Sequence, residues 1–202
     1  MAKSDTLLYL GTNRSVVAIE PQTGAERWRT RLPHTGGSIV TVLVSRSHLF
    51  AGHAGRAYGL DKRSGSIIWE NGLPRMGFYP VLLARDAVVS RQASPVYVGT
   101  SRYVAALETS GGTELWRTKL PHVGSAVVSL LASDVCLFVG HAGYVYGLDK
   151  RVGSILWENG LPRLGYYPVL PAMEGIEGMS AAAVAAYRAQ QQRHATAAAA
   201  GA

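Results

Sequence analysis

Short runs of apolar and aromatic residues, separated by glycine, proline and small polar residues, follow one another along most of this chain. In its middle they are Ser38–Val44, His48–Gly52, Arg56–Leu60 and Ser66–Glu70. Runs of this length and composition between turn residues are typical of antiparallel strands. Some, such as Val135–Val139, are apolar on both faces, which indicates a sheet packed between two other sheets. The pattern predicts an all-β protein.

The runs belong to a unit that occurs four times. The stretch His53–Pro74 returns as His141–Pro162 and, in looser form, as Thr12–Pro33 and Thr100–Pro121. The second half of the repeated region follows the first at an offset of 88 residues without insertion or deletion. Roughly three positions in five are identical between the halves, so we infer a duplication and one shared structure.

Each unit contains a predicted hairpin that is followed by a tryptophan. Asp61 can accept hydrogen bonds from the amides of its own turn, and Gly65 can adopt the positive φ that closes it. Asp149 and Gly153 take these roles in the later copy. The four tryptophans of the chain occupy one repeated position, four residues after the turn glycine: Trp28, Trp69, Trp116 and Trp157.

These residues resemble the quinoprotein-type (PQQ-like) repeat of β-propellers. The resemblance is carried by Gly52, then Gly59-Leu60-Asp61, Gly65 and Trp69, and four tandem matches span about residues 6–171. It implies four-stranded antiparallel blades, four per chain, in which the tryptophans are wedges between blades and not a stacking platform for ligands. The repeat occurs both in quinone-dependent dehydrogenases and in propellers that only bind partners, so it does not define a function.

The first predicted blade is incomplete. It has strands at Leu7–Leu10, Val16–Ile19 and Glu26–Arg29 but no inner strand before them, whereas Tyr166–Leu170 is an inner strand without a blade of its own. Inner strands of the other blades are expected at Ser38–Val44, Phe78–Leu82 and Ser125–Leu131, with a polar loop at 84–94. We therefore expect residues 1–171 to form a propeller segment whose first blade is completed by residues 166–170. The Ala-rich tail, 172–202, is expected to be partly helical or disordered.

Two closed assemblies fit this arrangement. Four blades could close within one chain, with the last strand pairing beside the first. We favour an eight-bladed ring formed by two chains that exchange their C-terminal strands, because an open half-ring would expose an apolar blade face and unpaired strand edges. The expected partner is therefore a second copy of the chain.

The composition of the chain narrows the classes of protein to which it could belong. The sequence has no apolar run long enough for a signal peptide or a membrane span, so we expect a soluble, cytoplasmic protein that does not bind membranes. Cys136 is the only cysteine, which excludes an internal disulfide. The net charge of +7 is spread over turns and strand ends. It is compatible with a solvated surface or with an acidic protein or peptide as partner, and we do not expect nucleic acid binding.

Candidate binding residues lie in loops that emerge on one face of a propeller, between second and third strands and between outer and next inner strands. Imidazole and guanidinium groups there could bind an anion or an acidic peptide. The alternative is that the histidines bind backbone carbonyls and the arginines are solvated. The candidates are Arg14, His34, His53, Arg75, Arg102, His122, His141 and Arg163.

No residue qualifies as catalytic. The dehydrogenases that this chain resembles in its repeats need a calcium site of acidic and amide oxygens and a catalytic aspartate, whereas Asp61 and Asp149 belong to turns. His53 and His141 lack chelate spacing and neighbouring acids, so we expect no metal site and no cofactor. We predict a non-catalytic binding or scaffolding module for protein–protein interaction. The alternatives are a lectin-like or anion-sensing propeller that uses the histidine and arginine face, and, third, a degenerate quinone-dependent oxidoreductase.

Overall fold

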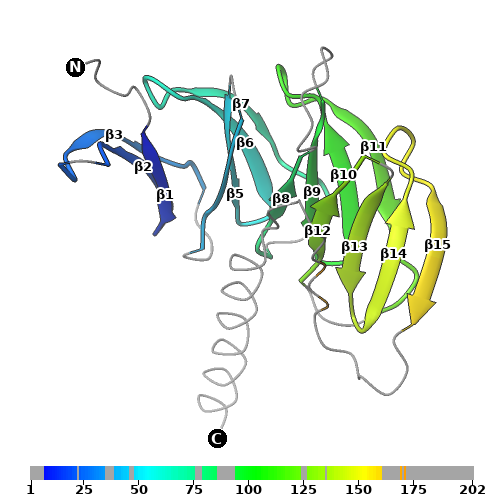
Figure 1. Ribbon diagram of the computed structural model, residues 1–202. Helices are drawn as coiled ribbons and strands as arrows, with labels where there is room; N and C mark the ends of the chain where they lie inside the picture. Colours follow the sequence, from blue (N-terminus) through cyan, green and yellow to red (C-terminus); the bar gives the residue numbers. More distant parts are fainter. Residues whose placement is uncertain are drawn as a thin grey trace, which may run out of the picture.

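The computed structural model describes residues 7–21, 23–34, 39–45, 48–75, 79–85, 94–123, 127–134, 136–160, 169 and 171. Within these residues, fifteen strands form four antiparallel sheets (Figure 1). The first sheet has three strands, β1 (Leu8–Thr12), β2 (Ser15–Ile19) and β3 (Glu26–Arg31). The other three sheets have four strands each.

In each four-stranded sheet the strands lie side by side in chain order. The second sheet consists of β4 (Thr41–Val44), β5 (His48–His53), β6 (Arg56–Asp61) and β7 (Ile67–Asn71). The third consists of β8 (Leu82–Ala84), β9 (Val96–Thr100), β10 (Tyr103–Leu107) and β11 (Glu114–Lys119). The fourth consists of β12 (Ser129–Ala132), β13 (Leu137–His141), β14 (Tyr144–Leu148) and β15 (Ile155–Gly160).

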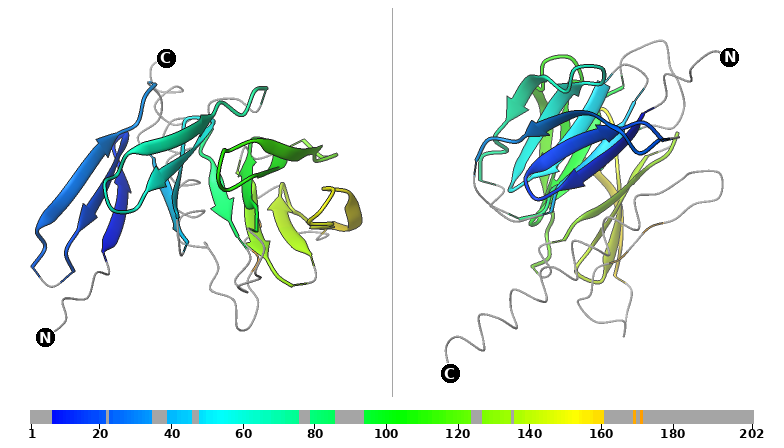
Figure 2. Two further views of the ribbon diagram at one scale, coloured as in Figure 1. Left: turned by 90° about the horizontal axis from the view of Figure 1, so that it is seen from above. Right: turned by 90° about the vertical axis from the view of Figure 1, so that its left-hand side faces the viewer.

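The sheets stand face to face in a fan, in the order in which they occur along the chain (Figure 2). The first and the last sheet are at opposite ends of this fan (Figure 1). The predicted all-β propeller of antiparallel blades is thereby confirmed. In the described residues β1 pairs only with β2, so the first blade has three strands and the fan is open.

The inner strand of the third sheet begins later than the sequence pattern predicts. It is Leu82–Ala84 and not Phe78–Leu82, because the residues before Leu82 bond to the preceding sheet. The amide of Gly55 donates to the carbonyl oxygen of Tyr79 at 3.0 Å, and the hydroxyl of Thr41 donates to that of Val81 at 2.6 Å. Ala84, which the sequence pattern predicts to begin a loop, is instead the last residue of β8 and pairs with Tyr97.

The chain after β15 is described at two positions only. Val169 accepts a hydrogen bond from the hydroxyl of Ser129, as Val81 does from Thr41 at the equivalent position of the first half. Val169 therefore stands against the fourth sheet at the place where the inner strand of a further blade would begin. The remainder of the predicted strand Tyr166–Leu170 and the tail from residue 172 lie outside the described residues.

The hairpin turns follow from their sequence. One carboxylate oxygen of Asp61 accepts hydrogen bonds from the amides of Arg63 and Ser64 at 3.0 and 2.8 Å, and these bonds hold the pKa of Asp61 below its usual range. Gly65 has a φ of 75° and donates its amide to the carbonyl of Asp61 at 2.9 Å. Asp149 and Gly153 form the same turn, with Asp149 accepting from the amides of residues 151 and 152.

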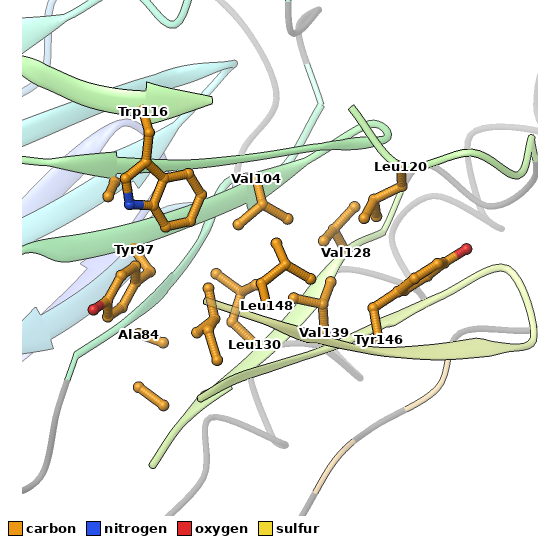
Figure 3. Packing of buried hydrophobic residues seen from close by; sticks show 13 residues of the cluster. Ala84, Tyr97, Val104, Trp116, Leu120, Val128, Leu130, Val139, Tyr146 and Leu148 are labelled. Carbon is orange, nitrogen blue, oxygen red and sulfur yellow. The ribbon is translucent and has the colours of Figure 1, made fainter. Parts of the chain in front are cut away.

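The core lies between sheets and not within any one of them. In the cluster between the third and fourth sheets, Trp116 and Tyr97 from one sheet meet Leu137, Val139 and other apolar side chains from the next (Figure 3). Two further clusters repeat this arrangement at the two earlier boundaries between sheets. The second and third sheets each bury both faces between neighbours, and their strands are accordingly near-continuous apolar runs.

Candidate binding surface

The turns from the second to the third strand of each blade lie on one end of the fan, together with the segments that leave the outer strands. The backbone fixes this: the amide of Leu32 donates to the carbonyl of Arg14 at 2.7 Å, and that of Leu120 to the carbonyl of Arg102 at 2.8 Å. We call this end the loop face. Its described residues are 13–14, 32–34, 54–55, 72–75, 101–102, 120–123 and 142–143.

A first polar cluster on the loop face joins the first two sheets. Nε2 of His34 lies 2.9 Å from a carboxylate oxygen of Glu70, and Arg56 forms an ion pair with the same carboxylate. Tyr58 is buried beneath them, and its burial, with the nearby charge of Glu70, raises the pKa of Tyr58 to about 12. Arg14 is close enough to oppose that shift. One acid thus links two basic residues from neighbouring blades.

A second cluster has the same plan between the third and fourth sheets. Nε2 of His122 lies 2.6 Å from a carboxylate oxygen of Glu158, and its ring stacks on Tyr144 with centroids 3.7 Å apart. Arg102 donates to the carbonyl oxygens of residues 120 and 121 at 3.1 and 3.2 Å. Tyr146 is buried below, and burial is the main cause that raises the pKa of Tyr146 to about 12.

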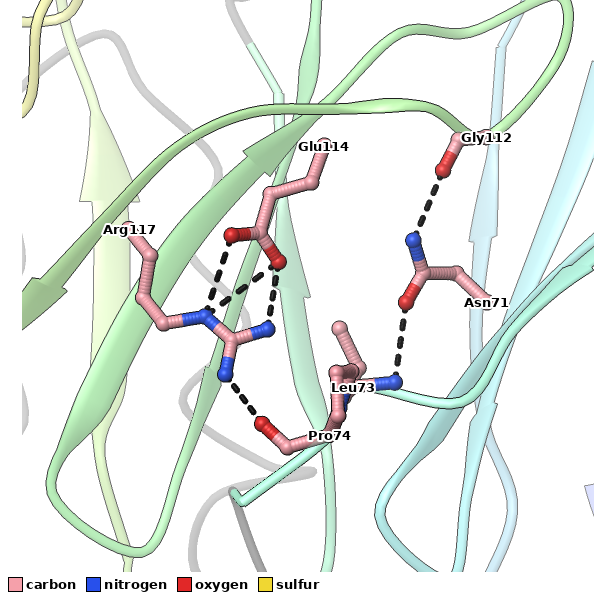
Figure 4. A network of polar contacts seen from close by, with 6 residues as sticks. All are labelled: Asn71, Leu73, Pro74, Gly112, Glu114 and Arg117. Atoms are coloured by element: carbon pink, nitrogen blue, oxygen red, sulfur yellow. Dashed lines mark hydrogen bonds and ion pairs between the residues drawn. The ribbon is translucent and has the colours of Figure 1, made fainter.

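Arg75 lies between these clusters and is exposed, with a φ of 68°. The segment before it is fixed by a network at the boundary between the second and third sheets (Figure 4). Asn71 donates to the carbonyl of Gly112 at 2.9 Å and accepts from the amide of Leu73 at 2.8 Å, while Arg117 donates to the carbonyl of Pro74. The predicted site residue Arg163 lies outside the described residues.

Two of the predicted site residues are not on the surface. His53 and His141 are fully buried, and their Nδ1 atoms lie 3.1 and 3.3 Å from the carbonyl oxygens of Ile39 and Val127, which precede the inner strands. Burial lowers the pKa of His141. The expectation that these two histidines line an exposed anion site is therefore wrong, since the end of the second strand turns them toward the interior.

The sequence reasoning missed the acids of the site. Glu70 and Glu158 each follow the blade tryptophan directly, and their strands place them opposite Tyr58 and Tyr146. The repeated Trp-Glu-Asn triplet is the sequence feature that could have indicated these acids. Placing its glutamate on the loop face requires the strand register, which shifts by one residue between Gly59 and Leu60.

The opposite end of the blades carries the hairpin turns. There the Asp61 and Asp149 carboxylates are engaged by their own turn amides, and the thiol of Cys136 is buried in the core, where burial raises its pKa. These groups do not fit the calcium and quinone site of the dehydrogenases that share the repeat. Across the described ranges, no three His, Cys, Asp or Glu residues are grouped as metal ligands would be. The described part of the chain also holds no helix with the length and apolarity of a membrane span.

Antiparallel blades in a fan, each joined to the next through a tryptophan, define a β-propeller of PQQ-like repeats. The family model described as outer membrane protein assembly factor BamB matches residues 9–166. The chain therefore belongs to this family. Among curated proteins, none matches the chain.

Solved structures show the same fold at low sequence identity. Quinohemoprotein alcohol dehydrogenase from Comamonas testosteroni aligns with 77% of this chain and 33% of its own, at 15% identity and a TM-score of 0.57. BamB from Moraxella catarrhalis aligns with 82% and 64%, at 16% identity and a TM-score of 0.50. The computationally designed Ika8 protein aligns with 85% and 51%, at 18% identity and a TM-score of 0.63. The chain thus spans less than two thirds of each of these proteins, which include both an enzyme and an assembly factor.

Proposed function

We propose that this chain is a non-catalytic binding or scaffolding module that docks an acidic protein or peptide on its loop face. The observation that carries the proposal is the preformed surface built from repeat-related loops, in which Arg14, Arg75 and Arg102 flank the two acid-paired histidines. Within the described residues, none of these three arginines forms an ion pair. Val123 beside them is 72% exposed and offers an apolar contact at the same surface.

Two further facts support a binding role. The family is described by the name of an assembly factor, which is a protein that acts on other proteins. The cofactor chemistry of the dehydrogenase neighbours would need oxygen ligands, whereas the carboxylates of Asp61, Asp149, Glu70 and Glu158 are already committed to turns and ion pairs. An absorption spectrum of the purified protein tests the competing oxidoreductase proposal, because a bound quinone would absorb in the near ultraviolet.

The docking proposal is tested with a fluorescent deca-glutamate peptide as the probe. We expect Arg75→Glu to weaken binding by about tenfold, since charge reversal replaces attraction with repulsion at an exposed site. The matched control is Arg63→Glu, which reverses the charge of another exposed arginine, in a hairpin turn at the opposite end, and should leave binding unchanged. Equal losses in both variants would indicate attraction by net charge alone and would overturn a specific loop-face site.

A lectin-like or anion-sensing function is favoured by a different observation, the ring of His122 stacked on Tyr144 beside Glu158. An aromatic ring flanked by a carboxylate is suited to a sugar, and a protonated histidine to a small anion. Calorimetric titration with citrate, phosphate and a set of monosaccharides separates these ligands from the peptide.

We also propose that the working assembly is a homodimer in which the C-terminal strand, residues 166–170, completes the three-stranded first blade of a second copy. The proposal is supported by the position of Val169 against the fourth sheet and by the edge of β1, which pairs with no strand of the described chain on its outer side. Removing all residues after Arg163 should give aggregated protein, whereas removing those after Gly175 should leave the dimer intact. A chain of 21.5 kDa should then have about twice that mass in solution. A monomer at micromolar concentration would contradict this arrangement.

A further inference from the structure

The boundaries between neighbouring sheets share one contact, which is used three times within the described chain. Three of the four tryptophans donate their indole N–H to a carbonyl in the hairpin turn of the next blade: Trp28 to Lys62 at 3.1 Å, Trp69 to Thr109 at 3.0 Å and Trp116 to Lys150 at 2.9 Å. In each case the acceptor is three residues before the turn glycine. The spacing of the acceptors makes the contact a fixed feature of the repeat.

The indole ring also covers the turn glycine itself. A Cβ built on Gly65 would lie 2.5 Å from the ring of Trp28, and Gly112 and Gly153 are covered in the same way by Trp69 and Trp116. All three glycines are buried. A second hydrogen bond accompanies this contact at each boundary. The side chain two residues after the tryptophan donates to the carbonyl of that glycine: Thr30 to Gly65 at 2.6 Å, Asn71 to Gly112 at 2.9 Å and Thr118 to Gly153 at 2.5 Å.

One tryptophan and one turn glycine are left over, at opposite ends of the fan. Trp157 is 42% exposed, whereas Trp69 and Trp116 are 7% and 8% exposed. Gly24 has the φ of the other turn glycines, 70°, but nothing lies within 4 Å of the Cβ position that is covered in the others. Trp157 therefore departs from the expected role of a wedge between blades, because no blade follows it in the described chain.

Apolar side chains near Gly24 and Trp157 also lack the neighbours that their counterparts have at the internal boundaries. On β1, Leu8 and Leu10 are 48% and 42% exposed. The corresponding residues of β5, β9 and β13 are fully buried against the aromatic pair of the preceding blade, and they are Leu49, Ala51, Val96, Val98, Leu137 and Val139. At the other end, Phe138 and Trp157 form such an aromatic pair, with ring centroids 6.0 Å apart. The two ends are therefore complementary halves of the boundary that the chain repeats internally.

We propose that the end of the fan formed by Trp157 and Asn159 docks on the first sheet of a second copy of this chain. The indole of Trp157 covers Gly24 of that copy and donates to the carbonyl of Pro21, and Asn159 donates to the carbonyl of Gly24. Leu8 and Leu10 pack on Trp157 and Phe138. This rests on the proposed homodimer and assigns its contact, made twice in a closed pair of chains.

A second copy fits these ends better than an unrelated partner does. Recognition requires a glycine turn whose Cβ position is open, the carbonyl three residues before that glycine, and two exposed apolar residues on a neighbouring strand. The first sheet presents all of these. Within the described residues the same chain does not supply them to itself, because the first and fourth sheets stand at opposite ends of the fan (Figure 1).

Two variants test the contact from its two sides. Trp157→Ala removes the ring, and Gly24→Asn places a side chain where the ring would lie while using a residue that tolerates a positive φ. Each should raise the dimer dissociation constant by at least about a hundredfold. A central tryptophan carries a large share of the affinity of an interface, and the closed dimer contains this contact twice. Leu156→Ala is the control, since Leu156 is 54% exposed and its counterparts Ile68 and Leu115 remain 48% and 55% exposed at the internal boundaries, so this change should leave the dimer unchanged.

Mixing the two variants gives the decisive result. A chain with Trp157→Ala retains a normal Gly24 turn, and a chain with Gly24→Asn retains a normal Trp157, so a mixed pair has one native contact and one contact relieved of the clash. Light scattering should show monomers of 21.5 kDa for each variant alone and a species of twice that mass for the mixture.

The failures separate the two proposals. A wild-type chain that is monomeric overturns both the homodimer and this contact. A dimer that survives Trp157→Ala and Gly24→Asn, with folded chains by circular dichroism, leaves the homodimer standing and overturns the contact. Variants that dissociate but are not restored by mixing would also overturn it, because a head-to-tail contact requires complementation.

Discussion

The indole ring of Trp69 lies directly against Gly112 of the neighbouring sheet and is held there by its hydrogen bond to the carbonyl of Thr109 at 3.0 Å. Beneath it, Gly59 of the same sheet is also in contact with the ring, so that the tryptophan is enclosed between two glycines. A bulky side chain at either glycine would displace the ring. The pairing of a large residue with two minimal ones sets how closely adjacent blades approach.

Trp69→Ala should therefore destabilise the chain far more than Trp157→Ala. Emptying the buried Trp69 site leaves a cavity and an unpaired carbonyl, which costs on the order of 3 to 5 kcal/mol. Trp157 is 42% exposed, so its removal should cost less than half as much. Urea unfolding, at a protein concentration where both variants are monomeric, provides the comparison. Equal losses would show that Trp157 is buried within its own chain.

Two glycines with the same backbone conformation allow two contributions to stability to be measured separately: the positive φ of the turn and the packing of the turn glycine against a tryptophan. Gly24 and Gly112 have φ values of 70° and 71°, but the Cβ position of Gly24 is open whereas that of Gly112 is covered by Trp69. In a Trp157→Ala background, Gly24→Ala should cost only the conformational term of about 1 to 2 kcal/mol. Gly112→Ala should cost a further 1 to 3 kcal/mol for overpacking. Similar midpoints of denaturation for the Gly24→Ala and Gly112→Ala variants would contradict the close packing of Trp69 on Gly112.

The repeat and its turns could be read from the sequence because they depend on local chemistry. Asp61 and Gly65 specify a turn wherever they occur at this spacing, and the alternation of apolar runs specifies the sheets. The direction of His53 and His141 could not be predicted, because it depends on where the second strand ends: β5 continues to His53 and β13 to His141. The acid partners of His34 and His122 likewise depend on the register across two sheets.

The hydroxyl of Tyr146 should weaken the fold at high pH. Burial raises the pKa of Tyr146 from 10.0 to about 12, so between these values the unfolded chain loses the phenolic proton while the folded chain keeps it. Stability should therefore be complete below pH 10 and decline as the pH rises toward 12. Tyr146→Phe should reduce this decline, because phenylalanine does not titrate. Denaturant unfolding at pH 8, 10 and 11 checks it.

At neutral pH the same substitution should be close to neutral or stabilising. The hydroxyl of Tyr146 is buried and makes no hydrogen bond of standard geometry, although the backbone of His122 lies near enough to oppose the rise of its pKa, so that its removal should relieve most of a desolvation cost. Tyr58 occupies the equivalent position in the first half and has the same two properties. Tyr58→Phe should behave in the same way. A loss of more than about 1 kcal/mol in either variant at pH 7 would indicate that the hydroxyl is bonded.

His141 should make the fold sensitive to mild acid. Its burial lowers the folded-state pKa below the ordinary value of 6.5, with the neighbouring charges of Arg102 and His122 acting in the same direction. As the pH falls through 6.5, the unfolded chain takes up a proton that the folded chain refuses, so stability declines until the folded-state pKa is reached and is constant below it. His141→Gln retains a donor for the carbonyl of Val127 but cannot be protonated. The free energy of unfolding of this variant should therefore change less between pH 7.5 and pH 5 than that of the wild type. An unchanged pH dependence would show that the folded and unfolded chains protonate His141 alike and would contradict the lowered pKa.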